Sequence, residues 1–597
     1  MASLLTVIAA GLAACSSHPS ASASGPRLSG GVATFALQPS TNPTYIFPMD
    51  DPSNFNVPNI DRLQYLLYRP LYWFGVGTQP VFNASLSLAP APTWSADGLT
   101  ATIHLKNYRW SNGQPVTASD VQLWQDIVDA NAAEWGGTVP GQYPGNVVST
   151  SVINSTTISF TFNKKYNQQW ALDNELGQIT PLPAAWNVTS LGAPANSGGC
   201  SPGQLSKCVA VYKFLNAQAE DTSTYASSPL WSIVDGPWKL KSYNTTGQVA
   251  FVPNKAYSGP VKPSLSEFIE EPFTSDSAEF DSVLSSQGGV DVGYLPPTDA
   301  QDAAHVEADG FTISSWTAWA ARFFDMNYNN PTAGPIFKQL YIRQAFEHLM
   351  DEKSIIKSIY DGYGSPEYGP IPSNIPNPWV SSYEESDPYP FSIPAAKSLI
   401  TSHGWTIENG TAVCTKPGTG PSDCGAGVQA GQKLEFNLVY ASGDSALESI
   451  MEVYKSDASE AGIQLNLQDA PFSTVISNRI CQPGPACMWD MIAWGGWTYS
   501  PDYYPEGSLL FGTGAGANRG NYSNPQNDAN DAAVLTASPS QANAAMVTYE
   551  NYLTQQAAQI WMPESPSQIT VVKDTLHGVL PQNSLLAMTP ENWYFTK

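Results

Sequence analysis

Strand-like and helix-like segments are mixed along the whole chain, and this mixture limits the fold more than any other feature of the sequence. Residues 99–105 alternate apolar and polar side chains, and so does the second half of 152–160, which predicts β-strands. The chain has 597 residues, several times the usual domain length of roughly 100–200 residues. We therefore expect an α/β protein with at least two large lobes.

Helical patterns lie between the strand-like segments. Thr117 and Asp120 form a capping-box pattern, which predicts the start of a helix that runs on through 121–127. A second helix is expected from about 338 to 350, and Asp351 leads into a third one. Their apolar faces are expected to pack in the core rather than form a site.

Two segments rich in Gly, Pro, Ser and Asn, 361–378 and 512–530, are expected to be loops. The run 512–516 is rich in glycine, but it lacks the GK[ST] ending and the following helix of a phosphate-binding P-loop. We interpret it as a flexible loop.

The charge of the chain limits its partners. With 26 basic and 51 acidic side chains the formal net charge is −25, and no Lys/Arg cluster stands out that could neutralise phosphates. Nucleic acid is therefore not an expected partner, and the excess of acid is typical of a soluble secreted surface. There is no HExxH or GxSxG motif. Widely spaced glycosidase carboxylates would leave no motif, so a secreted hydrolase stays open.

The N-terminus predicts export and a lipid anchor. The apolar run from Leu4 to Leu12 is too short to span a bilayer and has the length of a signal-peptide core, so residues 1–14 are expected to be removed. Leu-Ala-Ala followed by Cys15 resembles the lipobox of bacterial lipoproteins, and 15–28 would be a flexible tether. No Lys or Arg precedes the apolar run, which is compatible with a start codon further upstream. We expect an extracytoplasmic protein anchored to the cell membrane.

The other six cysteines fall into three close pairs. Each pair lies in a stretch containing Gly, Pro or Ser, which favours local disulfides in an oxidising compartment. Zinc is disfavoured, because no pair has the two-residue spacing of a zinc knuckle and the six histidines are scattered. We expect no metal and no cofactor. The expected pairs are Cys200 with Cys208, Cys414 with Cys424, and Cys481 with Cys487.

Several segments, taken in order, resemble the dipeptide- and oligopeptide-binding proteins of ABC importers, extracytoplasmic solute-binding family 5. The most specific match is the region from Trp94 to Val121, with the sequence YRWSNGQPVTASDV at its end. The matches span nearly the whole mature chain. The other matching segments are GPWKLKSY at 236–243 with Asn254 and Tyr257, FDMNY at 324–328, IRQAF at 342–346 with Met350-Asp351, and 489–497.

The resemblance implies a two-lobed, periplasmic-binding-protein-like (Venus-flytrap) α/β fold. Lobe one would comprise 29–295 with an extra subdomain, lobe two 296–561, and the C-terminal segment 562–597 would return to lobe one. The lobes would close over a ligand by a hinge motion. The implied function is the capture of short peptides for delivery to the membrane subunits of an ABC permease, without catalysis and, as in relatives, by a monomer.

The resemblance also implies charged contacts for the two ends of a peptide. In the family the cleft segment supplies a carboxylate for the peptide's amino group; by direct count that position is Ser500 here, and Asp502 lies two residues later. Asp502 is an alternative ligand contact or a surface loop acid. Arg479 matches a basic residue that some relatives use on the ligand carboxylate, with an exposed surface ion pair as the alternative.

Aromatic and amide side chains complete the predicted ligand site. The resemblance places Phe472, Trp494, Trp497 and Tyr499 along the groove, although packing in the core is the commoner fate of an indole. Asn54, Phe55 and Asn56 lie where a loop of lobe one would approach the ligand.

The ligand class stays open within the family. Members also take oligosaccharides, nickel complexes and opines. Nickel is disfavoured by the scarcity of histidine, whereas an oligosaccharide would use the 18 Trp and 28 Tyr and would account for Ser500 in place of an acid. An oligosaccharide is therefore the second ligand hypothesis.

Overall fold

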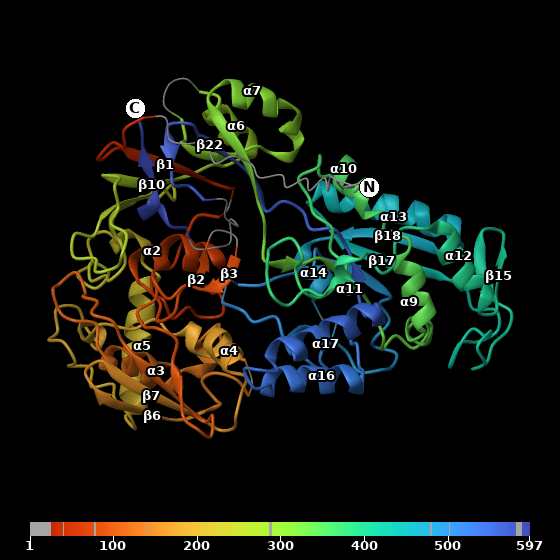
Figure 1. Cartoon of the computed structure of the whole chain (residues 1–597), viewed down its shortest axis with the longest axis horizontal. Helices are drawn as coiled ribbons and strands as arrows, with labels where there is room; N and C mark the ends of the chain where they lie inside the picture. The colour runs from red at the N-terminus through yellow and green to blue at the C-terminus, as the bar shows by residue number, and fades with distance from the viewer. Residues whose placement is uncertain are drawn as a thin grey trace, which may run out of the picture.

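The computed structural model describes residues 25–39, 41–76, 79–139, 141–285, 289–477, 480–500, 502–580 and 588–597. The predicted signal peptide, Cys15, most of the predicted tether and Arg479 lie outside the described residues. The described chain forms two α/β lobes side by side, each built around its own sheet (Figure 1).

Lobe one is organised around a seven-stranded mixed sheet. Its central strand β1 pairs in parallel with β10 and β11, and the outer strands pair antiparallel. Because β22 comes from the end of the sequence, the chain leaves this lobe and later returns to it, close to helices α6 and α7 (Figure 1). In spatial order the strands are β12 (Phe311–Trp316), β22 (Gln568–Lys573), β11 (Val292–Tyr294), β1 (Val32–Leu37), β10 (Glu267–Pro272), β9 (Val249–Pro253) and β8 (Trp238–Tyr243).

A second, four-stranded sheet in lobe one carries the region that resembles the family most. Helix α3 packs on β6, β7 and α5, and its N-terminus has the predicted capping box: Thr117 N–H donates to the Asp120 carboxylate over 2.7 Å. The elements are β4 (Thr93–Trp94), β5 (Thr100–His104), β7 (Thr157–Phe162), β6 (Val147–Asn154), α3 (Ala118–Ala130) and α5 (Leu205–Ala219).

Lobe two contains a five-stranded sheet covered by helices. Strand β17 pairs in parallel with β18 and β19, and β14 pairs antiparallel with β19 and β21. Predicted helix 338–350 is α9, and Asp351 caps α10 through a bond from Ser354 N–H. The elements are β18 (Gln464–Ala470), β17 (Glu435–Ala441), β19 (Met491–Ala493), β14 (Phe323–Met326), β21 (Ile560–Trp561), α9 (Leu340–Glu347), α10 (Glu352–Ser358), α11 (Ser382–Glu385), α12 (Ile393–Ser402), α13 (Ser445–Ala461), α16 (Pro525–Thr536) and α17 (Ala542–Gln556).

The strand predicted in the second half of 152–160 is β7, which pairs with β6 around a turn at 155–156. Two other sequence predictions need correction. The loop predicted at 512–530 ends at Asn524, whose side chain caps α16, because Pro525 is favourable in the first turn of a helix. Strand β12 still belongs to the lobe-one sheet, so the chain first leaves that lobe after Trp316 rather than at 295.

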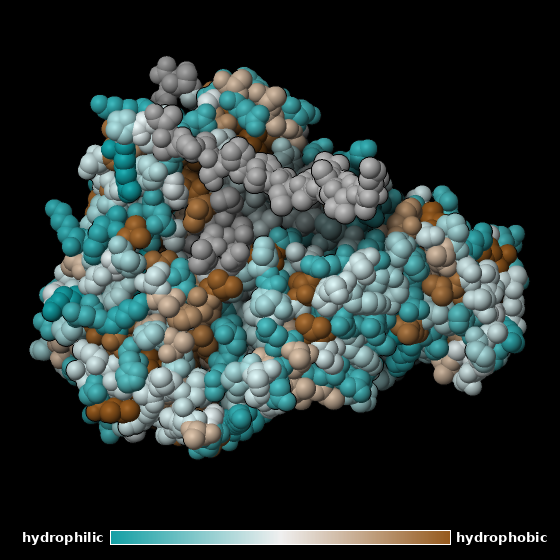
Figure 2. Space-filling model, viewed as in Figure 1, coloured by the Kyte–Doolittle hydropathy of each residue, from teal (hydrophilic) through white to brown (hydrophobic). Residues whose placement is uncertain are grey.

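Most tryptophans are part of the hydrophobic core. Eleven of them are almost fully buried, so the aromatic surplus serves packing before it serves a binding surface. On the face shown in Figure 2, hydrophilic side chains predominate and hydrophobic ones are scattered between them. The predicted disulfides are present: Cys200–Cys208, Cys414–Cys424 and Cys481–Cys487, with Cα–Cα distances of 4.4, 6.0 and 5.7 Å.

Candidate ligand-binding site

A cavity of about 540 Å³ lies between the two lobes. Lobe one contributes side chains from 48–74, 124–143 and 174–180, and lobe two contributes 497–503 and Leu509. Its volume falls within the range of roughly 300–1,000 Å³ that is typical of small-molecule sites. A hinge motion of the lobes would open and close this space.

The lobe-two wall is positioned by a short strand pair. Trp497 and Thr498 pair antiparallel with Ala321 and Ala320, and Tyr499 N–H donates to the Trp319 carbonyl over 2.7 Å. Two glycines precede this strand in left-handed conformations, and a side chain at Gly496 would overlap the Ala321 carbonyl oxygen. The glycine pair therefore allows the segment to lie close against β13 (Ala320–Ala321) and to present 497–503 to the cavity.

Six of the predicted site residues line this cavity. They come from both lobes, as the resemblance implied, and they include both the counted acid position and the acid two residues later. The six are Phe55, Asn56, Trp497, Tyr499, Ser500 and Asp502.

Three other predicted residues lie outside the cavity lining. Trp494 packs edge-on against Trp497, with ring centroids 6.2 Å apart, and donates to Asp325 over 2.7 Å, so it supports the wall from behind. Phe472 packs on Trp494 and is 49% exposed. Asn54 donates its side-chain amide to Asp51 over 2.9 Å.

Asp502 joins the two lobes by a hydrogen bond. It is 8% exposed, and its Oδ2 accepts a bond of 2.5 Å from the side-chain amide of Gln178 in lobe one. Burial raises the pKa of Asp502, and bonds from Ser500 and Gln178 act in the opposite direction. Asn174 makes a further contact between the lobes, accepting a bond of 2.6 Å from Tyr504 N–H.

Two further carboxyl groups face the same cavity, and the sequence did not indicate either. Asp50 is 2% exposed and accepts a bond of 2.8 Å from Gln64, while burial raises its pKa well above the usual range. Asp61 is 4% exposed. Burial and then the charge of Asp502 raise the pKa of Asp61, whereas Arg62 lowers it. Asp61 lies in a one-turn π-helix, Ile60–Gln64, which no pattern in the sequence distinguishes from an α-helix.

Aromatic rings form most of the remaining wall. Tyr65 and Trp73 pack with centroids 5.6 Å apart, and Trp135 packs edge-on against both Trp124 and Tyr143. Such walls suit apolar side chains, sugar rings and organic cations. The lining aromatic residues are Phe55, Tyr65, Tyr72, Trp73, Phe74, Trp124, Trp135, Tyr143, Trp497, Tyr499 and Tyr503.

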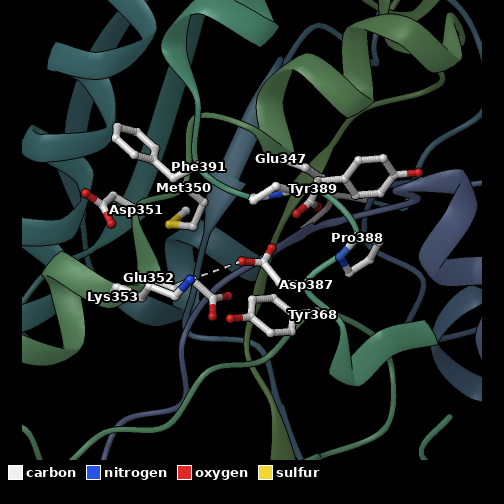
Figure 3. Close-up of a pocket in the computed structure, with 11 residues that line it drawn as sticks. Glu347, Met350, Asp351, Glu352, Lys353, Tyr368, Asp387, Pro388, Tyr389 and Phe391 are labelled. Atoms are coloured by element: carbon white, nitrogen blue, oxygen red, sulfur yellow. Dashed lines mark ion pairs between the residues drawn. The ribbon is translucent and has the colours of Figure 1, made fainter. Parts of the chain in front are cut away.

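A smaller pocket of about 200 Å³ lies within lobe two (Figure 3). Lys353 and Asp387 face each other there, with Nζ and Oδ2 3.7 Å apart, beside Glu352 and Tyr368. Because all of its lining comes from one lobe, closure of the lobes would not enclose a ligand in it. The interlobe cavity is therefore the stronger candidate.

Within the described residues, no group of three or more His, Cys, Asp or Glu side chains is arranged to hold a metal ion. No helix in the same part of the chain combines the length and apolar character needed to cross a bilayer.

Comparison with known proteins identifies the family. Protein XP55 of Streptomyces lividans is 26% identical over 420 residues, which are 68% of this chain and 65% of XP55. The oligopeptide-binding protein OppA of Lactococcus lactis subsp. lactis is 24% identical over 491 residues, 77% of this chain and 74% of OppA. The structure of AppA, an oligopeptide-binding protein of Bacillus subtilis in complex with a nonapeptide, is 18% identical, covers 96% of this chain and 100% of AppA, and has a TM-score of 0.63.

The similarity to AppA confirms the predicted two-lobed α/β fold. A family model described as bacterial extracellular solute-binding proteins, family 5, matches residues 83–517, which is more than half of the sequence. The chain therefore belongs to the family 5 solute-binding proteins, which act outside the cytoplasm.

Proposed function

We propose that this protein is the receptor of an ABC importer, which captures short peptides between its lobes and delivers them to a membrane permease. The observation that carries the proposal is the interlobe cavity, where Asp502 of lobe two meets Gln178 of lobe one. The similarity to OppA, an oligopeptide-binding protein, supports a peptide as the ligand. The proposal includes no chemical step on the ligand, and the receptor acts as a monomer.

The chemistry of the cavity suits a peptide's amino terminus. An ammonium group placed at Asp502 would form a charge-assisted hydrogen bond, which is stronger than a neutral one. The same carboxylate is bonded to Gln178, so an ammonium at this point would sit where the lobes meet. Arg479 stays the predicted partner of the ligand carboxylate.

A peptide receptor can accept many sequences if side chains occupy roomy pockets in which water adapts the hydrogen bonds. The polar side chains of Asn56, Gln142 and Thr180 line the cavity among the aromatic rings. We therefore infer that the peptide backbone and termini supply most of the specificity, with the aromatic walls accommodating its side chains.

An oligosaccharide is the second candidate ligand. The eleven aromatic rings that line the cavity favour it, because sugars stack on such rings, and carboxylates can accept bonds from their hydroxyls. This alternative keeps the receptor role and changes only the cargo.

The experiment that tests the ligand class is native mass spectrometry of the purified mature protein, followed by release and identification of the bound molecules. A mixture of short peptides would support the proposal. A bound sugar, or an empty protein whose melting temperature rises with oligosaccharides and not with peptides, would replace the peptide by the second candidate.

We propose in addition that Cys15 carries a lipid that anchors the receptor to the membrane. The support is the Leu-Ala-Ala-Cys motif and the polar tether that follows it. In cells, Cys15→Ala is expected to move the protein from the membrane fraction to the soluble extracytoplasmic fraction. Continued membrane association of that variant would contradict the anchor.

A further inference from the structure

The cavity has more negative groups than one peptide amino terminus requires. Asp502 serves the proposed ammonium contact, whereas Asp50 and Asp61 come from lobe one and are 2% and 4% exposed. All three acids line the cavity together with Tyr65, and after burial their charges raise the pKa of that residue. The cavity therefore has carboxyl groups from both lobes.

Asp61 lines the cavity and has a buried carboxylate oxygen without a partner among the described residues. Its Oδ1 atom has no hydrogen-bond partner in the part of the chain that the structure describes, although the residue is 96% buried. The adjacent Arg62 does not line the cavity; its guanidinium lies over the Phe35 ring at 5.3 Å from the centroid, and its charge interacts with Glu270 and then with Asp61. A buried carboxylate oxygen without a donor is costly, and a donor on the ligand would remove that cost.

The surroundings of Asp61 suit a cation. Among the described residues that line the cavity there is no Lys, Arg or His. The rings of Tyr65, Trp124 and Trp135 also face the cavity, and the faces of such rings attract ammonium and guanidinium groups. An apolar side chain would fill the same space but leave the Asp61 oxygen unpaired.

We propose that the preferred ligand is a short peptide whose first residue is Lys or Arg, with its amino terminus at Asp502 and its side-chain cation between Asp61 and Asp50. The inference rests on the proposed function, because it assumes that the ligand is a peptide. A charge-assisted bond to a buried carboxylate corresponds to an affinity gain of about 10- to 100-fold.

The test compares two tripeptides by isothermal titration calorimetry at pH 6.5. Lys-Ala-Ala and norleucine-Ala-Ala differ in the side-chain ammonium, and the first is expected to bind at least about tenfold more tightly. Ala-Ala-Lys has the same net charge with the basic residue in the last position, and it is expected to bind like the norleucine peptide. This third peptide separates a specific contact from general attraction to an acidic protein.

Substitutions then assign the contact. In Asp61→Asn the preference for Lys-Ala-Ala over the norleucine peptide should fall to within about twofold. Asp126→Asn is the matched control: Asp126 is also a buried lobe-one acid, bonded to Gln122 within α3, and it does not line the cavity. That variant should keep the full preference. Asp50→Asn replaces Asp61→Asn if the latter does not fold.

The outcomes separate the inference from the proposed function. Equal binding of the lysine and norleucine peptides by the unsubstituted protein would overturn the inference and leave the peptide receptor intact. Failure of all three peptides to bind, together with binding of a sugar, would overturn both. A lysine preference that survives in Asp61→Asn and in Asp50→Asn would overturn the assignment to these two carboxylates.

Discussion

Buried carboxyl groups occur in both lobes, but they face different surroundings. In lobe two, Glu367, Glu384 and Glu550 are fully buried, and after burial the carboxyl groups of Glu550 and Glu367 raise the pKa of Glu384. These three residues belong to the 361–378 loop, α11 and α17. Asp61, in contrast, faces a cavity of about 540 Å³ and shares it with aromatic rings.

The pKa values of the two groups change in the same direction. Burial is the largest cause of the raised pKa of Glu384 and of Asp61, and neighbouring carboxylates raise both further. In the Glu384 cluster, a proton shared between the carboxyl groups would satisfy them internally. In the cavity a cation of the ligand can take the place of that proton. Burial therefore raises the pKa of an acid in either lobe, whereas the groups that the acid faces decide whether that acid stabilises the fold or binds a ligand.

The largest effect is expected on the stability of the whole protein. Burial raises the pKa of Glu175 and of Glu270 to about 8 and that of Glu506 to about 7. A carboxyl group with a raised pKa in the folded state contributes stability below its unfolded pKa and loses it as the pH rises through the folded value. The free energy of unfolding should therefore fall by at least about 3 kcal/mol between pH 5 and pH 9.

Urea denaturation at pH 5, 7 and 9 measures this change, with tryptophan fluorescence and circular dichroism as separate probes. A constant or rising stability over that range would show that the buried acids are ionised in the folded protein. The buried acids of the two lobes would then not share a raised pKa.

The next effect concerns the lobe-two cluster alone. Gln at position 384 has an amide that can donate to Glu367 and Glu550 without holding an acidic proton. We expect Glu384→Gln to be more stable than the unsubstituted protein by about 1–2 kcal/mol at pH 8 and almost unchanged at pH 5. Denaturant titrations at both pH values test this. Glu384→Ala, which donates no bond and leaves a cavity, should be less stable at both.

Local sequence patterns predicted individual elements where the signal is short-range. Thr117 and Asp120 of the capping box lie within the first turn, and α3 starts where they indicate. The alternation in the second half of 152–160 predicted strand β7, whereas the turn at Ser155 and Thr156 has no Gly or Pro to mark it. Helix α16 was missed because its sequence is rich in Asn and Asp, and its burial depends on α17, which contacts it.

The site was predictable only where a resemblance supplied it. Counting along the cleft segment gave Ser500, with Asp502 two residues later as the alternative, and both line the cavity. Asp61 could not be located in this way, because an Asp next to Arg62 in the sequence is typical of a surface ion pair. Tertiary packing alone turns Arg62 towards Phe35 and Asp61 towards the cavity. For the same reason the sequence did not show that Trp494 packs behind the wall that Trp497 forms.

A smaller effect, of opposite sign, is expected on ligand binding. Only the ionised form of Asp61 and of Asp50 attracts a cation, and burial raises the pKa of both. The charge of Asp502 opposes ionisation of Asp61, whereas the charge of Arg62 favours it. Tyr65 is a further titratable group that interacts with these acids. The Kd of Lys-Ala-Ala should therefore fall as the pH rises and these acids ionise.

Calorimetry at pH 5, 6 and 7 measures this dependence while the peptide's amino terminus stays largely protonated. The norleucine peptide, which leaves Asp61 without a partner, should show a weaker change. A Kd that rises with pH would contradict the proposed cation contact, because ionisation of the two acids would then weaken binding.

The smallest effect separates acids that face the cavity from an acid that lies beside it. Asp173 is 3% exposed, accepts a bond of 2.7 Å from Gln169 and does not line the cavity. Burial raises the pKa of Asp173, and the charge of Asp502 raises it further. Without direct contact the interaction with a ligand cation is weakened by the protein's effective dielectric. Asp173→Asn should lower the affinity for Lys-Ala-Ala by only about twofold, against tenfold or more for Asp61→Asn. Equal losses in the two variants would mean that the total negative charge near the cavity, rather than the direction in which each carboxylate points, selects the ligand.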